Sequence, residues 1–131
     1  MKMREIKFRV WSKFYNDWIE SFCIKDGRVH LGNAVHYPGN QVSDAILMQY
    51  TGLKDKNGKE IYEGDIVSTD LSRPFLIVEY RNGAFLYQCH HNGQDYYDHM
   101  EPAFSEVVES TKYHEVIGNI YENPELLEES K

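Results

Sequence analysis

Apolar and polar residues alternate along most of the chain, and this period of two predicts strands with one buried face and one solvated face. A long stretch in the first half, residues 32–44, contains Pro38-Gly39-Asn40 and has no such period, so it is predicted to be a mobile loop. Turns are expected at residues 15–18, at Asp26-Gly27 and at residues 54–59, where Asn57-Gly58 accepts positive φ. The strands predicted outside the central hairpins are residues 6–11, 19–24, 28–31, 46–50 and 66–69.

The strongest local signal is a three-stranded antiparallel meander over residues 74–100. Asn82-Gly83 and Asn92-Gly93 are typical of two-residue hairpin turns, which fix the register of the strands that they join. One face of the meander is therefore predicted to be core: Leu76, Val78, Tyr80, Phe85, Tyr87, Cys89 and Tyr96. The opposite face is predicted to meet water or a partner: Glu79, Arg81, Gln88, His90, Asp95 and His99.

The end of the chain predicts a last strand at residues 113–121 and then a short helix at residues 124–129. Asn123 is expected as its N-cap and Pro124 as its first helical residue. Together these patterns predict a mainly β fold, α+β at most, with a short C-terminal helix. At 131 residues, the chain is expected to form one antiparallel β domain over residues 1–131.

Charge is spread unevenly along the chain, whose formal net charge is −7. Residues 1–28 carry seven basic and four acidic residues, a net +3, and the remainder carries seven basic and 17 acidic residues, a net −10. An acidic body argues against duplex DNA as a partner, because DNA binding needs a positive face. No apolar run approaches the roughly 20 residues of a membrane span, and no signal peptide is recognised. We therefore expect a cytoplasmic protein without a membrane partner.

Three segments resemble the YopX family, in the order in which the family has them. They are residues 6–11, residues 116–127, and residues 50–67, which read Tyr-Thr-Gly-Leu-Lys-Asp-Lys-Asn-Gly-Lys-Glu-Ile-Tyr-Glu-Gly-Asp-Ile-Val. The resemblance implies a phage or prophage accessory protein acting in the cytoplasm of a bacterial host. It implies no catalytic or ligand-binding residue. Gly64-Asp65-Ile66-Val67 is also similar to the turn that opens a strand in SH3-like barrels, so the core could take that form.

Candidates for metal binding and catalysis are weak. His90 and Asp95 would be cross-strand neighbours about 5 Å apart, but His99 falls about 13 Å farther along the strand than Asp95. Since zinc needs converging ligands, no metal or other cofactor is expected, and His90 and Asp95 are kept only as weak candidates.

No nucleophile elbow or Walker spacing occurs, so no enzyme is expected. Glu60, Glu63 and Asp65 are interpreted as a solvated face, and Cys23 and Cys89 as reduced core thiols.

Two surfaces are candidates for binding. Residues 75–78 are apolar at every position, so Phe75 and Ile77 need cover beyond the core. That cover could come from the C-terminal helix, through Leu126 and Leu127, or from a second copy in a homo-oligomer, which is the expected arrangement. With Tyr97 and His99 they form a possible protein-interaction surface. The second surface is a basic and aromatic hairpin: Arg9, Trp11, Lys13 and Tyr15, with Phe14 and Trp18. It could stack bases of single-stranded nucleic acid, or it could be an ordinary hairpin core. The leading hypothesis is a non-enzymatic protein-binding module, and the alternative is a single-strand nucleic-acid binder.

Overall fold

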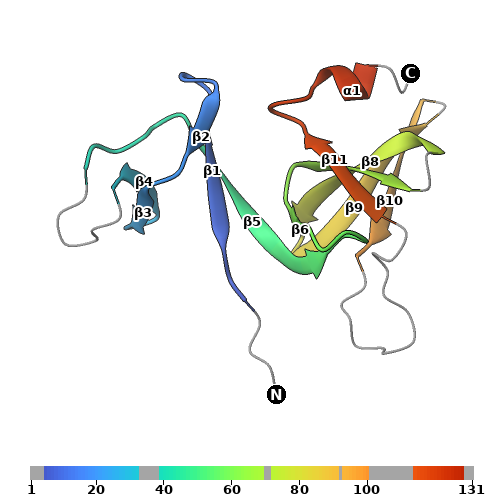
Figure 1. The fold of residues 1–131 in the computed structure, drawn as a ribbon, viewed down its shortest axis with the longest axis horizontal. Helices are drawn as coiled ribbons and strands as arrows, with labels where there is room; N and C mark the ends of the chain where they lie inside the picture. Colours follow the sequence, from blue (N-terminus) through green and yellow to red (C-terminus); the bar gives the residue numbers. More distant parts are fainter. Residues whose placement is uncertain (1–4, 33–38, 70–71, 92, 101–113, 129–131) are drawn as a thin grey trace. The chain divides into compact units, whose positions relative to one another are not determined.

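The computed structural model describes residues 5–32, 39–69, 72–91, 93–100 and 114–128, and it divides the chain into two compact units. The smaller unit is Lys7–Gln49, and the larger unit combines Met1–Ile6 with Tyr50–Lys131. The described residues form eleven strands and one four-residue helix (Figure 1). The mainly β fold predicted from the sequence is therefore confirmed.

The smaller unit is built from two hairpins. β1 (Phe8–Ser12) pairs antiparallel with β2 (Asp17–Ile19) and with the first half of β5 (Ala45–Lys54). β3 (Phe22–Lys25) pairs with β4 (Arg28–Leu31) across the predicted Asp26-Gly27 turn. The single strand predicted at residues 19–24 is wrong, because β2 and β3 pair with different neighbours. Apolar and polar residues can keep alternating where the chain passes from one strand to the next, so the alternation does not show that the pairing strand has changed.

The predicted loop at residues 32–44 is described only in part, since residues 33–38 lie outside the described ranges. Residues 39–42 run beside β4 through backbone hydrogen bonds. The Leu31 N–H donates to the Asn40 carbonyl at 2.9 Å, and the Val42 N–H donates to the Val29 carbonyl at 2.9 Å. These bonds tie the end of the loop to a hairpin, and the mobility of the whole loop stays a prediction.

The larger unit contains a five-stranded antiparallel sheet with the order β10-β9-β8-β7-β11. Its strands are β7 (Asp65–Thr69), β8 (Ser72–Arg81), β9 (Ala84–His91), β10 (Gln94–His99) and β11 (His114–Asn119). The first four, β7 to β10, form a meander, and β11 returns beside β7. The short β6 (Glu60–Tyr62) pairs with the second half of β5.

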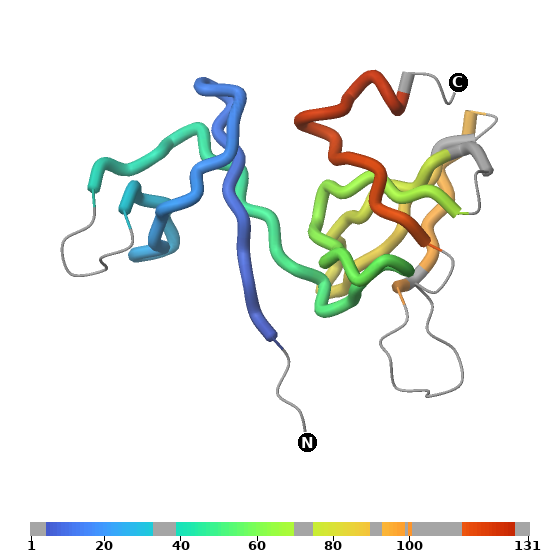
Figure 2. The backbone as a smooth tube through the Cα atoms, viewed as in Figure 1, coloured from blue at the N-terminus to red at the C-terminus, as the bar shows by residue number. Residues whose placement is uncertain are grey.

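The core of the larger unit collects apolar side chains from strands far apart in sequence. In Figure 2 the green, yellow and red segments of this unit curl around a shared interior. This arrangement brings together side chains from strands between β6 and β11 and from Met100, which follows β10. The buried residues of this core are Ile61, Val67, Val78, Tyr87, Met100 and Val116.

The register predicted for the meander is confirmed. Val78 pairs with Tyr87, and Tyr87 pairs in turn with Asp98. The predicted burial is right for Val78 and Tyr87 and wrong for Tyr80 and Tyr96, which are 49% and 50% exposed. Tyr80 lies beside the Asn82-Gly83 turn and Tyr96 lies on the edge strand, so both extend past the core. The face expected to meet water also has a buried residue, Leu86, so both faces of the sheet are partly covered.

The C-terminal helix is α1 (Glu125–Glu128), close to its predicted position. The Asn123 carbonyl accepts the N–H of Leu126, as expected at a helix start. The side chain of Asn123 instead turns back, and its Oδ1 accepts the N–H of Asn119 at 3.2 Å. A Cβ on Gly118 would lie 2.5 Å from that Oδ1 atom, so this turn requires a glycine there. Within the described ranges, no helix has the length and apolar character needed to cross a bilayer.

Candidate interaction site

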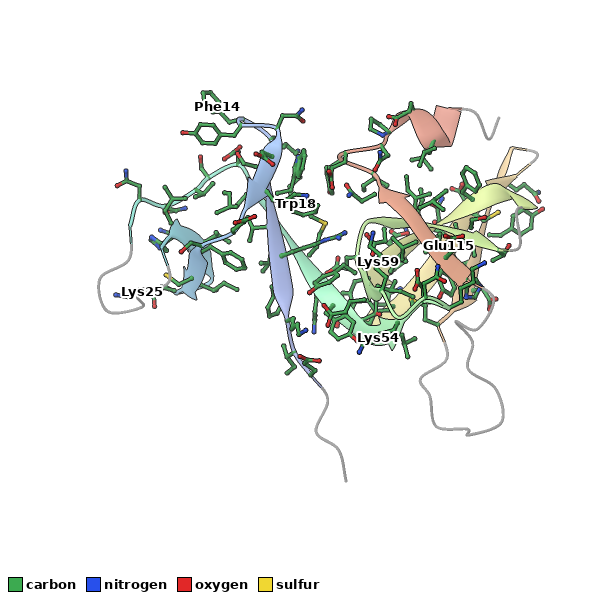
Figure 3. All side chains as sticks on the ribbon, in the orientation of Figure 1. Phe14, Trp18, Lys25, Lys54, Lys59 and Glu115 are labelled. Carbon is green, nitrogen blue, oxygen red and sulfur yellow. The ribbon has the colours of Figure 1, made fainter. Side chains whose placement is uncertain are left out.

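The turn between β1 and β2 presents Phe14 and Tyr15, the most exposed large apolar side chains that the structure describes. Phe14 is 82% exposed and Tyr15 is 73% exposed. Their rings meet edge to face, with centroids 5.1 Å apart and an angle of 87° between the ring planes. Figure 3 shows Phe14 at the end of this hairpin. Phe14 and Tyr15 together form the aromatic tip of this hairpin.

Hydrogen bonds to Asp44 fix the backbone that carries the aromatic tip. Asp44 Oδ2 accepts the Phe14 N–H at 2.6 Å and the Ser12 hydroxyl at 2.8 Å. The Ser12 oxygen in turn accepts the Tyr15 N–H at 3.2 Å. The Phe14 N–H and then the Ser12 hydroxyl hold the pKa of Asp44 below its ordinary value of 3.8, so its carboxylate is charged at neutral pH. The turn is therefore anchored to a segment about 30 residues away in sequence.

The base of the same hairpin is packed. Trp11 is only 5% exposed and meets its cross-strand partner Trp18 edge to face, with centroids 5.0 Å apart. The Arg9 guanidinium lies 4.7 Å from the centroid of the Trp18 ring. Of the four residues proposed to contact nucleic acid, Arg9 and Trp11 therefore belong to the packed base. Lys13 and Tyr15 are exposed beside Phe14.

The turn itself begins earlier than the sequence pattern indicated. β1 ends at Ser12 and β2 starts at Asp17, so Lys13 to Asn16 make the turn, and Trp18 is a strand residue. Asn16 has a φ of 52°, a left-handed conformation that asparagine tolerates. The signal for the tip was present in the sequence as two aromatic residues followed by an asparagine, between two alternating stretches.

The predicted protein-interaction surface lies on β8 and β10, with β9 between them. Phe75 and Ile77 are half-buried, and Tyr97 is exposed. Ile77 and Tyr97 both pair with Gln88, so their side chains share one face of the sheet. The side chain of His99 lies outside the described part of the chain.

The weak metal candidates are cross-strand partners, as the register predicted: Asp95 pairs with His90. The Asp95 carboxylate accepts a long hydrogen bond from Gln88 Nε2, at 3.4 Å, and the His90 side chain is not described. The described residues contain no cluster of three or more His, Cys, Asp or Glu that could hold a metal ion. Cys23 and Cys89 are both free thiols, and burial raises the pKa of Cys89.

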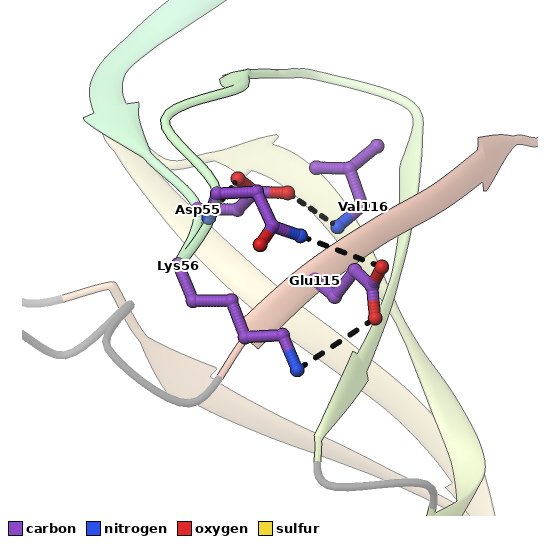
Figure 4. A network of polar contacts seen from close by, with 5 residues as sticks. Asp55, Lys56, Glu115 and Val116 are labelled. Carbon is purple, nitrogen blue, oxygen red and sulfur yellow. Dashed lines mark hydrogen bonds and ion pairs between the residues drawn. The ribbon is translucent and has the colours of Figure 1, made fainter.

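Two carboxylates of the larger unit have roles that the sequence reading missed. Asp55 Oδ1 accepts the N–H groups of Asn57 and Lys59, each at 2.9 Å. Its Oδ2 accepts the N–H of Val116 at 3.0 Å (Figure 4). Asp65 is buried, and its Oδ2 accepts the N–H of Tyr62 at 2.8 Å. Interpreting Asp65 as part of a solvated face was therefore wrong. The signal for Asp55 was an aspartate two residues before Asn57-Gly58, where its side chain can bond the backbone ahead of it.

Comparison with known proteins identifies a family and a fold. The protein-family model described as YopX protein matches residues 7–128 of this chain. The crystal structure of protein EF1440 from Enterococcus faecalis is similar to this chain, with a TM-score of 0.52 and 24% sequence identity over 95% of this chain and 99% of that chain. At that identity the likeness shows the fold alone. None of the curated proteins matches this sequence.

Proposed function

This chain belongs to the YopX protein family, and from that premise we propose that it is a non-enzymatic protein-binding module. The observation that carries the proposal is the aromatic tip, held on a turn that Asp44 anchors. In the same proposal the protein is a phage or prophage accessory factor, and its partner is a protein in the cytoplasm of a bacterial host.

Exposed aromatic side chains on a fixed backbone favour binding for two physical reasons. Burying a side chain such as Phe14 in a partner's pocket contributes roughly 1.5–3 kcal/mol, because apolar surface leaves water. The hydrogen bonds from Phe14 and Ser12 to Asp44 mean that the turn loses little conformational freedom on binding. Aromatic residues of this kind are enriched among the few side chains that dominate protein interfaces.

The charge of the smaller unit favours an apolar interface. Lys7–Gln49 contains five basic and four acidic residues, a net charge of +1. Since the whole chain has a net charge of −7, the larger unit has a net charge of −8. At the tip, Lys13 is accompanied by the ionised Asp44. A surface with nearly balanced charge gains little from long-range attraction, and recognition then depends on the two rings.

Single-stranded nucleic acid is the second candidate partner, because Lys13 lies next to two exposed rings that could stack on bases. The two candidates differ in their response to salt. Contacts to phosphate release counterions, so nucleic-acid affinity falls steeply as salt rises, whereas burial of Phe14 and Tyr15 in a protein pocket does not weaken in that way.

Self-association through Phe75 and Ile77 belongs to the same proposal. Both side chains are half-buried within one chain, so a second copy would cover what remains of their surface. Light scattering should then report a mass above the 15.4 kDa of one chain. A mass of one chain would remove self-association and leave the aromatic tip as the binding site.

The proposal is tested by affinity capture from cells that make the protein. The tagged wild-type chain should retain a protein that the double variant Phe14→Ser/Tyr15→Ser does not. The matched control is Ile24→Ser, which removes another exposed apolar side chain of the same unit, 38% exposed on β3, and should retain the same protein as wild type. Equal retention by the tip variant, or retention of nucleic acid only, would contradict the proposal.

A further inference from the structure

Among the described residues, the outer edge of β10 has no strand beside it. The inner edge of β10 pairs with β9. All side chains of residues 94–98 are exposed. An edge strand presents a row of backbone N–H and C=O groups that can pair with an extended segment. We propose that this edge binds an extended basic segment of a partner protein by strand addition.

The side chains of β10 give this edge its preference for positive charge. Successive residues of a strand point to opposite faces, so Asp95 and Tyr97 lie on one face and Tyr96 and Asp98 lie on the other. Each face of the edge therefore offers one carboxylate and one phenol ring. No lysine or arginine occurs between residues 82 and 111, and the nearest one before them, Arg81, lies over the Tyr97 ring and pairs with Glu79 at 3.4 Å.

The tyrosine rings add a second attraction for arginine. The Arg81 guanidinium already lies 4.5 Å from the centroid of the Tyr97 ring, which shows that a ring of this strand accepts a guanidinium over its face. Tyr96 is on the opposite face and is half exposed, and its hydroxyl donates to Gln94 Oε1 at 2.9 Å. An arginine of the incoming strand would lie over the Tyr96 ring in the same way.

The same charges disfavour a second copy of this chain as the occupant. Antiparallel pairing of two β10 strands would bring Asp95 and Asp98 close to the same carboxylates of the other copy. Like charges that face each other across strands are destabilising. A basic segment instead places opposite charge across from Asp95 and Asp98. Since β10 has six residues, the matching segment is about six residues and roughly 20 Å long.

This binding edge belongs to the larger unit, whereas the aromatic tip belongs to the smaller unit. The two sites can therefore be tested separately. The variant Phe14→Ser/Tyr15→Ser should leave peptide binding at β10 unchanged. Failure of the tip variant to change protein capture would count against the aromatic tip, whereas failure of the peptide to bind would count against the β10 edge.

The test uses the full chain, labelled with 15N, and a synthetic peptide about eight residues long in which pairs of arginines alternate with pairs of valines, so that each face of the added strand carries arginine. Titration with the peptide should shift the backbone amide signals of Gln94–His99 and slow their exchange with solvent. A control peptide of the same sequence and charge carries N-methyl groups on alternate residues and so cannot complete the hydrogen-bond ladder. It should bind at least about tenfold more weakly.

A charge variant of the protein tests the second half of the proposal. Asp95→Asn/Asp98→Asn should weaken peptide binding several-fold at low salt while the shifted signals stay within β10, and its amide spectrum reports whether it is folded. Equal affinity for the two peptides would show attraction by charge alone and would overturn strand addition. Shifts confined to other strands, or no binding at all, would overturn the site.

Discussion

Asp55 Oδ2 accepts a hydrogen bond from the backbone N–H of Val116 at 3.0 Å, joining residues 61 positions apart in sequence. Next to this contact, the Lys56 N–H donates to the His114 carbonyl at 3.0 Å. The turn after β5 is thus attached to β11 by these two hydrogen bonds and by a longer one, from Asn57 Nδ2 to Glu115 Oε1 at 3.4 Å. Figure 4 shows the Asp55 contact. Asp55 and Val116 both lie in segments that resemble the YopX family.

Replacing Asp55 with alanine should destabilise the fold by about 2–4 kcal/mol. Asn57 and Lys59 are exposed, so water can replace the carboxylate at their N–H groups, but Val116 is buried and its N–H would be left without an acceptor. Urea unfolding measures the change. The control is Lys56→Ala, which removes only an exposed ion pair with Glu115, 3.7 Å long, and should cost less than about 1 kcal/mol. Equal losses for the two variants would contradict the assigned role of Asp55.

The contribution of Asp55 should depend on pH. Burial alone would raise the pKa of this carboxyl, but the N–H groups of Val116, Lys59 and Asn57 and the charge of Lys59 outweigh burial and lower the pKa below 3.8. A lowered pKa in the folded state gives stability that is present above the unfolded value, about 3.9, and is lost as the pH falls toward the folded value. The stability difference between wild type and Asp55→Asn should therefore shrink below about pH 4. A difference that stays constant down to acid unfolding would show that Asp55 is not the group responsible.

Tyr87 makes the opposite prediction at alkaline pH. Burial, and then the nearby negative charge of Asp98, raise the pKa of Tyr87 well above its ordinary value of 10.0. A raised pKa gives stability that is complete below the unfolded value and is lost as the pH rises above it. Wild type should lose stability above about pH 10, and Tyr87→Phe should lose less over the same range. Identical pH profiles would mean that Tyr87 ionises as easily in the folded chain as in the unfolded one.

Gly118 and Asn123 should behave as a coupled pair. Gly118→Ala places a methyl group against Asn123 Oδ1, and moving that side chain breaks its hydrogen bond with the Asn119 N–H. We expect a loss of about 1–3 kcal/mol in the wild-type background. In the background of Asn123→Ala, which removes the obstructing atoms, the same change should cost at least about 1 kcal/mol less. Additive effects in this double-mutant cycle would rule out the steric contact as the reason for glycine.

The sequence could predict the strands and the register of the meander, because these depend on local patterns. Asn82-Gly83 adopts positive φ at both residues, 51° and 82°, so a two-residue turn fixes the pairing of Val78 with Tyr87. Burial was less predictable. Whether Tyr80 and Tyr96 are covered depends on where the core ends, and alternation along one strand carries no information about that limit.

The candidate site was predictable in composition but not in detail. The sequence placed aromatic and basic residues in the first hairpin, yet periodicity could not show that Trp11 is buried while Phe14 is exposed. That division depends on the turn starting at Lys13 and on Asp44, which reaches the turn from a distant segment. The Asp55 contact with Val116 escaped prediction for the same reason, since it joins residues far apart in the chain.

The most direct measurement of the central claim, that the aromatic tip contacts a partner protein, is photo-crosslinking in living cells. A photoreactive benzoyl-phenylalanine is incorporated at Phe14, or at the control position Ile24 on the same unit, and the cells are irradiated. The account predicts a discrete adduct with another protein from position 14 and none from position 24. Absence of a protein adduct at position 14, the same adduct from both positions, or an adduct with nucleic acid alone would contradict it.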